Sequence, residues 1–176
     1  LLKQAEDALE KVTGPDVPAD YDALSLLLDV TTEKLGRAWG AVGHLNSVAD
    51  TAELRAAFNE NLPRVTEFYT RLGADERLYA KYKALAASEQ GITLSAPRKR
   101  ALDNALRGFV LGGAELQGAA KERFAAIQEQ QAALSQSFSE HVMDATDAFS
   151  HYASTEELAG LPQDVLDATA AAAQAE

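Results

Sequence analysis

The 176-residue chain contains no cysteine. This absence excludes disulfide bonds, thiolate zinc sites and a cysteine nucleophile. The chain also lacks any apolar run near the roughly 20 residues that a membrane-spanning helix needs, and it shows no signal peptide. We therefore expect a cytoplasmic protein with no membrane partner.

Positive charge is also scarce. The 16 lysines and arginines are outnumbered by 27 aspartates and glutamates, so the net charge is −11. Such a surface repels phosphate backbones and anionic lipid, and we expect no nucleic-acid partner. The basic cluster Arg98-Lys99-Arg100 has no aromatic residues interleaved with it. We interpret it as a solvated helix start, suited to pairing with an acidic surface in a part of the protein outside this chain.

What the chain does have is helical periodicity in almost every segment, and no alternating strand pattern is convincing. Its length predicts one domain, residues 1–176. Because the proline and glycine breaks are short, neighbouring helices should pack antiparallel. The sequence therefore predicts an all-α fold, an irregular antiparallel bundle built around one long helix at about 118–149. The other helices are expected over 1–12, from about Asp20, over 53–72, 75–90 and 95–111, and after Pro162.

The long helix is expected to supply the centre of the core. Its apolar residues recur three or four positions apart, which predicts a buried stripe. This predicted stripe consists of Phe124, Ile127, Leu134, Phe138, Val142, Ala145 and Phe149. Replacing Phe138 by alanine is then expected to cost about 3–5 kcal/mol, and replacing Gln136 under about 0.5 kcal/mol.

Several helix ends carry recognisable signals. Asp50 is expected to cap the helix over 53–72, with Glu53 completing a capping box, and Asp75 to cap the next helix. Gly73 and Gly91 are expected to end these two helices, Gly73 in the left-handed conformation. Gly112-Gly113 interrupts the helical pattern, but it has no lysine, serine or preceding strand that would make a phosphate loop.

The chain contains three histidines, the residue type most often found as a zinc ligand in metal-dependent hydrolases. None of the three is followed by glutamate, so the zinc-binding motif His-Glu-x-x-His is absent. Four potential ligands, His141, Asp144, Asp147 and His151, share one face of the long helix. Their axial spread of about 15 Å is too long for all four to bind one ion. We interpret them as a solvated face with local carboxylate–imidazole pairs, with a metal site as the alternative.

Two further features leave alternatives open. His44 either makes a structural hydrogen bond near a helix end or contacts a peptide. The aromatic group Phe68, Tyr69, Tyr79 and Tyr82 is expected to pack in the core, with a tyrosine rim around bound peptide as the alternative. We assign no catalytic, cofactor-binding or metal-binding residue within the chain.

The order of several residue blocks is more particular than helical amphipathicity requires. These blocks are Gly43-His44-Leu45-Asn46-Ser47-Val48, Leu78-Tyr79-Ala80-Lys81-Tyr82, the run 98–107, Val142-Met143-Asp144-Ala145-Thr146 and Leu158-Ala159-Gly160-Leu161-Pro162. In this order they resemble the N-terminal helical region of the thimet-oligopeptidase family of zinc metallopeptidases. The resemblance covers about residues 24–170.

The resemblance implies one wall of a deep channel that admits short peptides. The opposite, catalytic portion would carry the zinc ion and would be this chain's main partner. Since Leu1 is not an initiator methionine and the last residues carry no helix stop, we expect an N-terminal fragment that lacks the catalytic domain and is inactive alone. The alternative is a stand-alone helical interaction or scaffold module.

Overall fold

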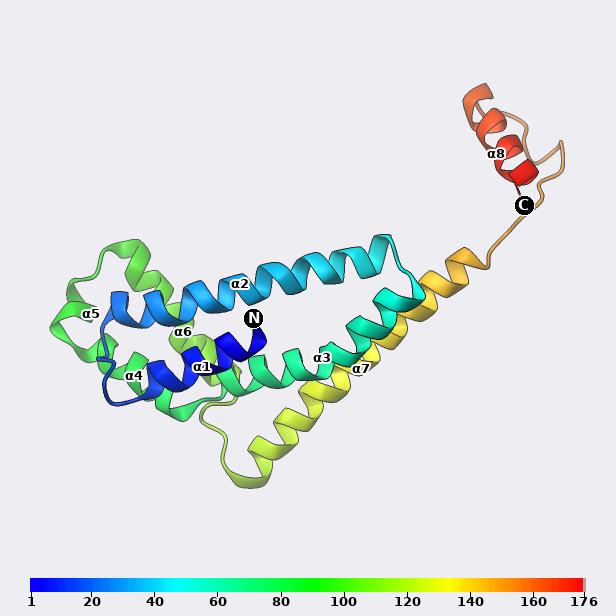
Figure 1. The fold of residues 1–176 in the computed structure, drawn as a ribbon. Helices are drawn as coiled ribbons and strands as arrows, with labels where there is room; N and C mark the ends of the chain where they lie inside the picture. Colours follow the sequence, from blue (N-terminus) through cyan, green and yellow to red (C-terminus); the bar gives the residue numbers. More distant parts are fainter. Residues whose placement is uncertain (176) are drawn as a thin grey trace. The chain divides into compact units, whose positions relative to one another are not determined.

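The computed structural model describes the fold of residues 1–175 and side-chain burial through Gln174. Over this range it contains eight helices and no strand (Figure 1). The helices are α1 Leu2–Thr13, α2 Tyr21–Val48, α3 Ala52–Gly73, α4 Glu76–Ala87, α5 Glu89–Thr93, α6 Ala96–Leu111, α7 Gly118–Asp147 and α8 Gln163–Ala175. The all-α prediction is confirmed.

The chain divides into two compact units, Leu1–Ser139 and Glu140–Glu176. The second unit holds the last residues of α7 and all of α8. Over residues 140–174 of this unit, no side chain is buried. The hydrophobic core therefore belongs to the first unit. That residues 1–176 form a single domain stays a prediction.

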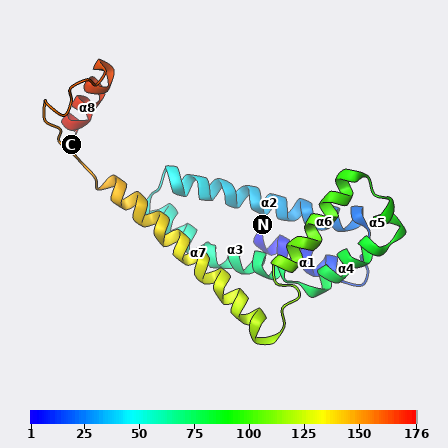
Figure 2. The same ribbon diagram turned by 180° about the vertical axis from the view of Figure 1, so that it is seen from behind.

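Helix α1 lies at the middle of the core, between α2, α3 and α4 (Figures 1 and 2). Its face of Ala5, Leu9 and Val12 is completely buried, as expected for apolar residues spaced three or four apart. The residues of the core cluster are Ala5, Leu9, Val12, Val17, Leu24, Leu28, Leu35, Phe68, Leu78, Tyr79, Leu85, Leu102, Phe109 and Ala114. Among the described residues, none after Ala114 belongs to this cluster.

The loop between α1 and α2 is tied down by one lysine of α4. The ammonium group of Lys81 donates hydrogen bonds to the carbonyl oxygens of Gly14, at 2.6 Å, and of Val17. Prolines at positions 15 and 18 keep this loop extended and leave its carbonyls without helical partners. Lys81 satisfies two of them and fixes the loop on the core.

The long helix has the predicted length, but it does not lie at the centre of the core as predicted. Helix α7 begins at Gly118 and ends at Asp147, but none of its residues, all of them described, is buried. Phe138, expected at the centre of the core, is 70% exposed. The bundle is built around α1 instead. Amphipathic spacing predicts an apolar face, but it does not say which element of the structure covers that face.

The caps are partly as predicted. Asp75 accepts hydrogen bonds from the backbone N–H groups of Arg77 and Leu78, at 2.9 and 3.0 Å, so its prediction is confirmed. Thr51 rather than Asp50 caps α3, accepting from the N–H of Leu54. Asp50 instead accepts from the guanidinium of Arg55 at 2.8 Å. The charge-assisted hydrogen bond to Arg55 is stronger than a neutral cap hydrogen bond, so Asp50 pairs with Arg55 and Thr51 supplies the cap.

Gly73 ends α3 as predicted, but it does not adopt the predicted left-handed conformation. Gly73 is the last residue of α3, and Ala74 follows it as the cap. A Cβ atom added to Gly112 would lie 2.7 Å from the carbonyl oxygen of Gly73. The two glycines therefore let the ends of α3 and α6 touch backbone to backbone. Gly113, with φ +90, then turns the chain toward α7.

The helix predicted over 75–90 is broken in two. Helix α4 ends at Ala87, and Ser88 caps α5 by accepting from the N–H of Gly91 at 3.1 Å. Gly91 lies inside α5 and is buried. An added Cβ there would lie 2.1 Å from the carbonyl oxygen of Leu85. Gly91 thus permits the close return of the chain and does not end the predicted helix.

Candidate functional site

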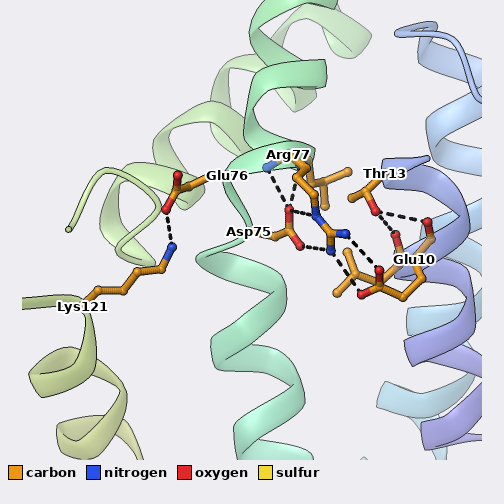
Figure 3. Close-up of polar contacts among 8 residues, drawn as sticks. Glu10, Thr13, Asp75, Glu76, Arg77 and Lys121 are labelled. Atoms are coloured by element: carbon orange, nitrogen blue, oxygen red, sulfur yellow. Dashed lines mark hydrogen bonds and ion pairs between the residues drawn. The ribbon is translucent and has the colours of Figure 1, made fainter. Parts of the chain in front are cut away.

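A polar cluster fixes the start of α4 against α1 (Figure 3). The guanidinium of Arg77 pairs with Asp75 at 2.8 Å and with both carboxylate oxygens of Glu10, at 2.9 and 3.1 Å. Burial opposes ionisation of Asp75, but hydrogen bonds from Arg77 and from the N–H of Leu78 outweigh it and hold the pKa of Asp75 below its usual value. These contacts are structural, because each charged group of the cluster is paired with an oppositely charged group of the same cluster.

Replacing Asp75 by alanine is expected to lower the free energy of unfolding by about 2 kcal/mol at pH 7, because the helix cap and the Arg77 pair are both lost. The pKa of Asp75 is depressed on folding. Its contribution is therefore present above the unfolded pKa near 4 and is lost as the pH falls through the folded value. Urea unfolding at pH 7 and below pH 3 should show a gap between wild type and variant that shrinks in acid.

The control for this prediction is Asp7→Ala, which removes an exposed carboxylate paired with Lys3 at 3.0 Å. A surface pair one helical turn apart is worth about 0.3–0.5 kcal/mol. If Asp75→Ala and Asp7→Ala have the same small effect, Asp75 does not hold the start of α4.

Helix α7 is anchored to the rest of the first unit near its start. Lys121 donates to a carboxylate oxygen of Glu76, in the first turn of α4, at 2.6 Å (Figure 3). Phe124 is half-buried, and a Cβ added to Gly113 would lie 3.2 Å from its ring. These contacts hold the first two turns of α7.

Two open pockets lie on either side of Phe124, between α3 and α7. One has a volume of about 380 Å³ and is lined by Trp39, Val65, Thr66, Tyr69, Thr70, Gly73, Leu111, Gly112, Phe124 and Gln128. The other has a volume of about 580 Å³ and is lined by Thr66, Glu67, Thr70, Arg71, Ala74, Lys121, Glu122, Phe124, Ala125, Ala126 and Glu129. Since α3 and α7 leave this much space between them, α7 does not close the surface of α3.

On α7 the polar side is half-buried and the apolar side is exposed. Gln128, Ala132 and Gln136 are half-buried. Ile127, Leu134 and Phe138 are 43%, 71% and 70% exposed. At 100° per residue, these three lie within about 40° of one another, on the side of α7 roughly opposite the half-buried row. We call Ile127, Leu134 and Phe138 the α7 stripe.

The metal ligands considered from the sequence are not brought together. Among the described residues, no group of three or more histidine, cysteine, aspartate or glutamate side chains is placed to hold a metal ion. His141, Asp144, Asp147 and His151 are all exposed. The Nε2 atom of His151 lies 3.6 Å from a carboxylate oxygen of Glu157. A carboxylate–imidazole pair thus forms with the residues that follow α7.

The expected core packing of the aromatic group is confirmed for three of its members. Phe68 and Tyr79 are buried, and Tyr82 packs edge-to-face on Phe109 at 5.2 Å. The hydroxyl of Tyr79 donates to Glu115 at 2.8 Å, and this bond raises the pKa of Tyr79. Burial raises the pKa of Tyr82 to about 12. Tyr69 differs, because it is 37% exposed and lines the 380 Å³ pocket.

Two other candidates have local partners or exposed side chains. Arg98 pairs with Asp22 of α2 at 3.1 Å and lies 4.9 Å from the ring centre of Tyr21. Its acidic partner is therefore within this chain, contrary to the interpretation of the basic cluster for this residue. The side chain of His44 is exposed, and its carbonyl oxygen accepts from the hydroxyl of Ser47 at 2.9 Å.

The sequence predicts that the α7 stripe is buried, and the structure leaves it exposed. Trp39 of α2 is half-buried, and its ring stacks on Phe58 of α3 with centroids 4.6 Å apart. For the stripe, a signal was present in the sequence. Polar Gln128 and Gln136 alternate with the apolar residues, and either side of the helix could have faced the bundle.

The comparisons with known proteins agree with the resemblance described above. The N-terminal domain of neurolysin/thimet oligopeptidase matches residues 1–121. Oligopeptidase A of Escherichia coli (strain K12) is 35% identical over 175 residues, covering 99% of this chain and 26% of that protein. A probable cytosolic oligopeptidase A of Arabidopsis thaliana is 36% identical, covering 98% and 25%.

Oligopeptidase A of Haemophilus influenzae is 38% identical over 155 residues, covering 88% of this chain and 23% of that protein. The chain thus spans about a quarter of the length of the curated relatives it matches. The sequence identity extends beyond residue 121 to nearly the whole chain. The helices up to that residue together form one hydrophobic core. The chain belongs to the neurolysin/thimet oligopeptidase family, of which it carries the N-terminal domain.

Proposed function

We propose that residues 1–176 are the N-terminal, non-catalytic helical domain of a zinc-dependent oligopeptidase that hydrolyses short peptides. The observation that carries this proposal is the match of residues 1–121 to the family's N-terminal domain. Relatives named oligopeptidase A, of which the chain covers about a quarter, support a longer parent protein. The domain's role would be to form one wall of a peptide-admitting channel.

The zinc ion of the parent protein would be held outside this region. The chain has no His-Glu pair, and its described residues offer no group of three or more metal ligands in one place. We therefore derive no catalytic step from these side chains. Their contribution would be to bind and orient peptide, and the apolar surface of Trp39 and Tyr69 in the 380 Å³ pocket is suited to that.

We also propose a cytoplasmic location. In the part of the chain that the structure describes, no helix is long and apolar enough to cross a membrane. One relative is named a probable cytosolic oligopeptidase A, and another is named organellar. The proposal follows the first of these and is tested by fractionating cells that express the complete protein.

Purified residues 1–176 are expected to show no turnover of a quenched fluorescent peptide and no stoichiometric zinc after dialysis. The complete protein is expected to cleave the same peptide and to lose this activity with a chelator. One tightly bound zinc ion per 176-residue chain, or chelator-sensitive turnover by that chain, would contradict the proposal.

The alternative function is a stand-alone helical interaction module, which the exposed α7 stripe would also suit. The coding sequence distinguishes the two. A reading frame that continues past Glu176 into His-Glu-x-x-His supports the oligopeptidase, whereas a stop codon there supports the module.

A further inference from the structure

We propose that the α7 stripe, Ile127, Leu134 and Phe138, is the surface on which the remainder of the parent polypeptide packs. This inference rests on the proposed function, because it requires a longer parent chain. Its occupant is the region that the relatives carry beyond the part matched here, not a second copy or a separate protein.

The first support is the inverted burial of α7. Leu134 and Phe138 are 71% and 70% exposed, while Gln136, between them in sequence, is half-buried. Large apolar side chains on the outer side of a helix cost hydration free energy unless something covers them. The polar side of α7 already lies toward the bundle, so a closer approach of α7 in this orientation would bury glutamines and leave the stripe exposed.

The second support is where the core ends. The last residue of the core cluster is Ala114, and the family's N-terminal domain matches residues 1–121. Helix α7 begins at Gly118, so all but its first four residues lie beyond both limits. The sequence identity to the relatives nevertheless continues through α7. Helix α7 follows a core that is already complete, and its apolar side is exposed. That side is therefore available to pack against the part of the parent polypeptide beyond the matched region.

The third support concerns the occupant. The relatives are about four times as long as the matched region, which leaves ample chain to cover the stripe. The stripe residues Ile127, Leu134 and Phe138 are 43%, 71% and 70% exposed, so together they offer on the order of a few hundred Å². A stable dimer needs roughly 800 Å² from each partner. A contact within one polypeptide needs less, because its two surfaces are already joined and lose no association entropy.

The test uses the complete protein with single cysteines introduced at neighbouring positions of α7, Leu134→Cys and Ala133→Cys. Both positions are exposed in this structure, but Ala133 lies about 100° around the helix from Leu134, off the stripe. The rate of maleimide labelling at each position is read by peptide mass mapping. We expect labelling at position 134 to be at least tenfold slower than at 133. Equal rates would overturn the inference.

A second pair of variants, Leu134→Asp and Ala133→Asp, guards against a labelling artefact. Leu134→Asp is expected to lower the unfolding temperature of the complete protein by several degrees more than Ala133→Asp. Slow labelling at 134 that speeds up on dilution, together with a dimer in light scattering, would assign the stripe to a second copy and overturn the inference.

Peptide hydrolysis by the complete protein is measured separately. Active protein with equal labelling at 133 and 134 would mean that the inference fails while the proposed function holds. Inactive protein with slow labelling at 134 would mean the reverse.

Discussion

Replacing Phe68 by alanine is expected to lower the free energy of unfolding by about 3–5 kcal/mol, whereas the same replacement at Phe138 should change it by under about 0.5 kcal/mol. Phe68 is 2% exposed and belongs to the core cluster around α1. Phe138 is 70% exposed on α7. The two substitutions delete the same atoms, so their difference reports burial alone.

Urea unfolding of the two variants of the 176-residue chain, followed by circular dichroism, measures this difference. The midpoint of Phe68→Ala should fall far below that of wild type, with Phe138→Ala close to wild type. Similar midpoints for the two variants, or a larger loss at Phe138, would mean that α7 packs its stripe into the core.

Replacing Gly91 by alanine is expected to cost about 3 kcal/mol, near the upper end of the usual range for overpacking. The added Cβ would lie 2.1 Å from the carbonyl oxygen of Leu85 and 3.0 Å from the Cα of Ala86. Both are backbone atoms, so the clash is relieved only by moving α4 and α5 apart. Thermal unfolding of the purified variant measures the loss.

The matched control is Gly40→Ala in the middle of α2. No atom lies within 4 Å of a Cβ added there, and alanine favours a helix interior over glycine by about 0.5–1 kcal/mol. This variant should therefore be slightly more stable than wild type. A Gly91→Ala variant as stable as Gly40→Ala would show that the return between α4 and α5 is more open than the structure has it.

Local signals predicted most of the helices. The Asp75 cap and the buried face of α1 followed from rules that involve residues within two turns of one another. Thr51 supplies the cap of α3 in place of Asp50, which the capping rule did not predict because that rule does not weigh the competing ion pair of Asp50 with Arg55. The boundaries of α7 were likewise close to prediction, since capping and breaking residues are local.

Contacts between distant residues were not predictable from the sequence. The approach of Gly112 to Gly73 joins positions far apart in the chain, so neither glycine reveals its role alone. The orientation of α7 depends on which surface of α3 it contacts. The spacing of apolar residues along α7 does not contain this information. For the candidate site, the sequence correctly placed Phe68 and Tyr79 in the core and Tyr82 against it. It did not distinguish Tyr69, which lines a pocket.

Amide hydrogen exchange on the dilute, monomeric 176-residue chain tests most directly whether the core is complete without α7. Residues 127–139 of α7 include no buried side chain, whereas Leu9 in α1 and Leu78 in α4 are fully buried. The amides over 127–139 should therefore exchange at least a hundredfold faster than those near Leu9 and Leu78. Equal protection of α7 and these two helices would contradict the account, because it would show that α7 is part of the same cooperative core.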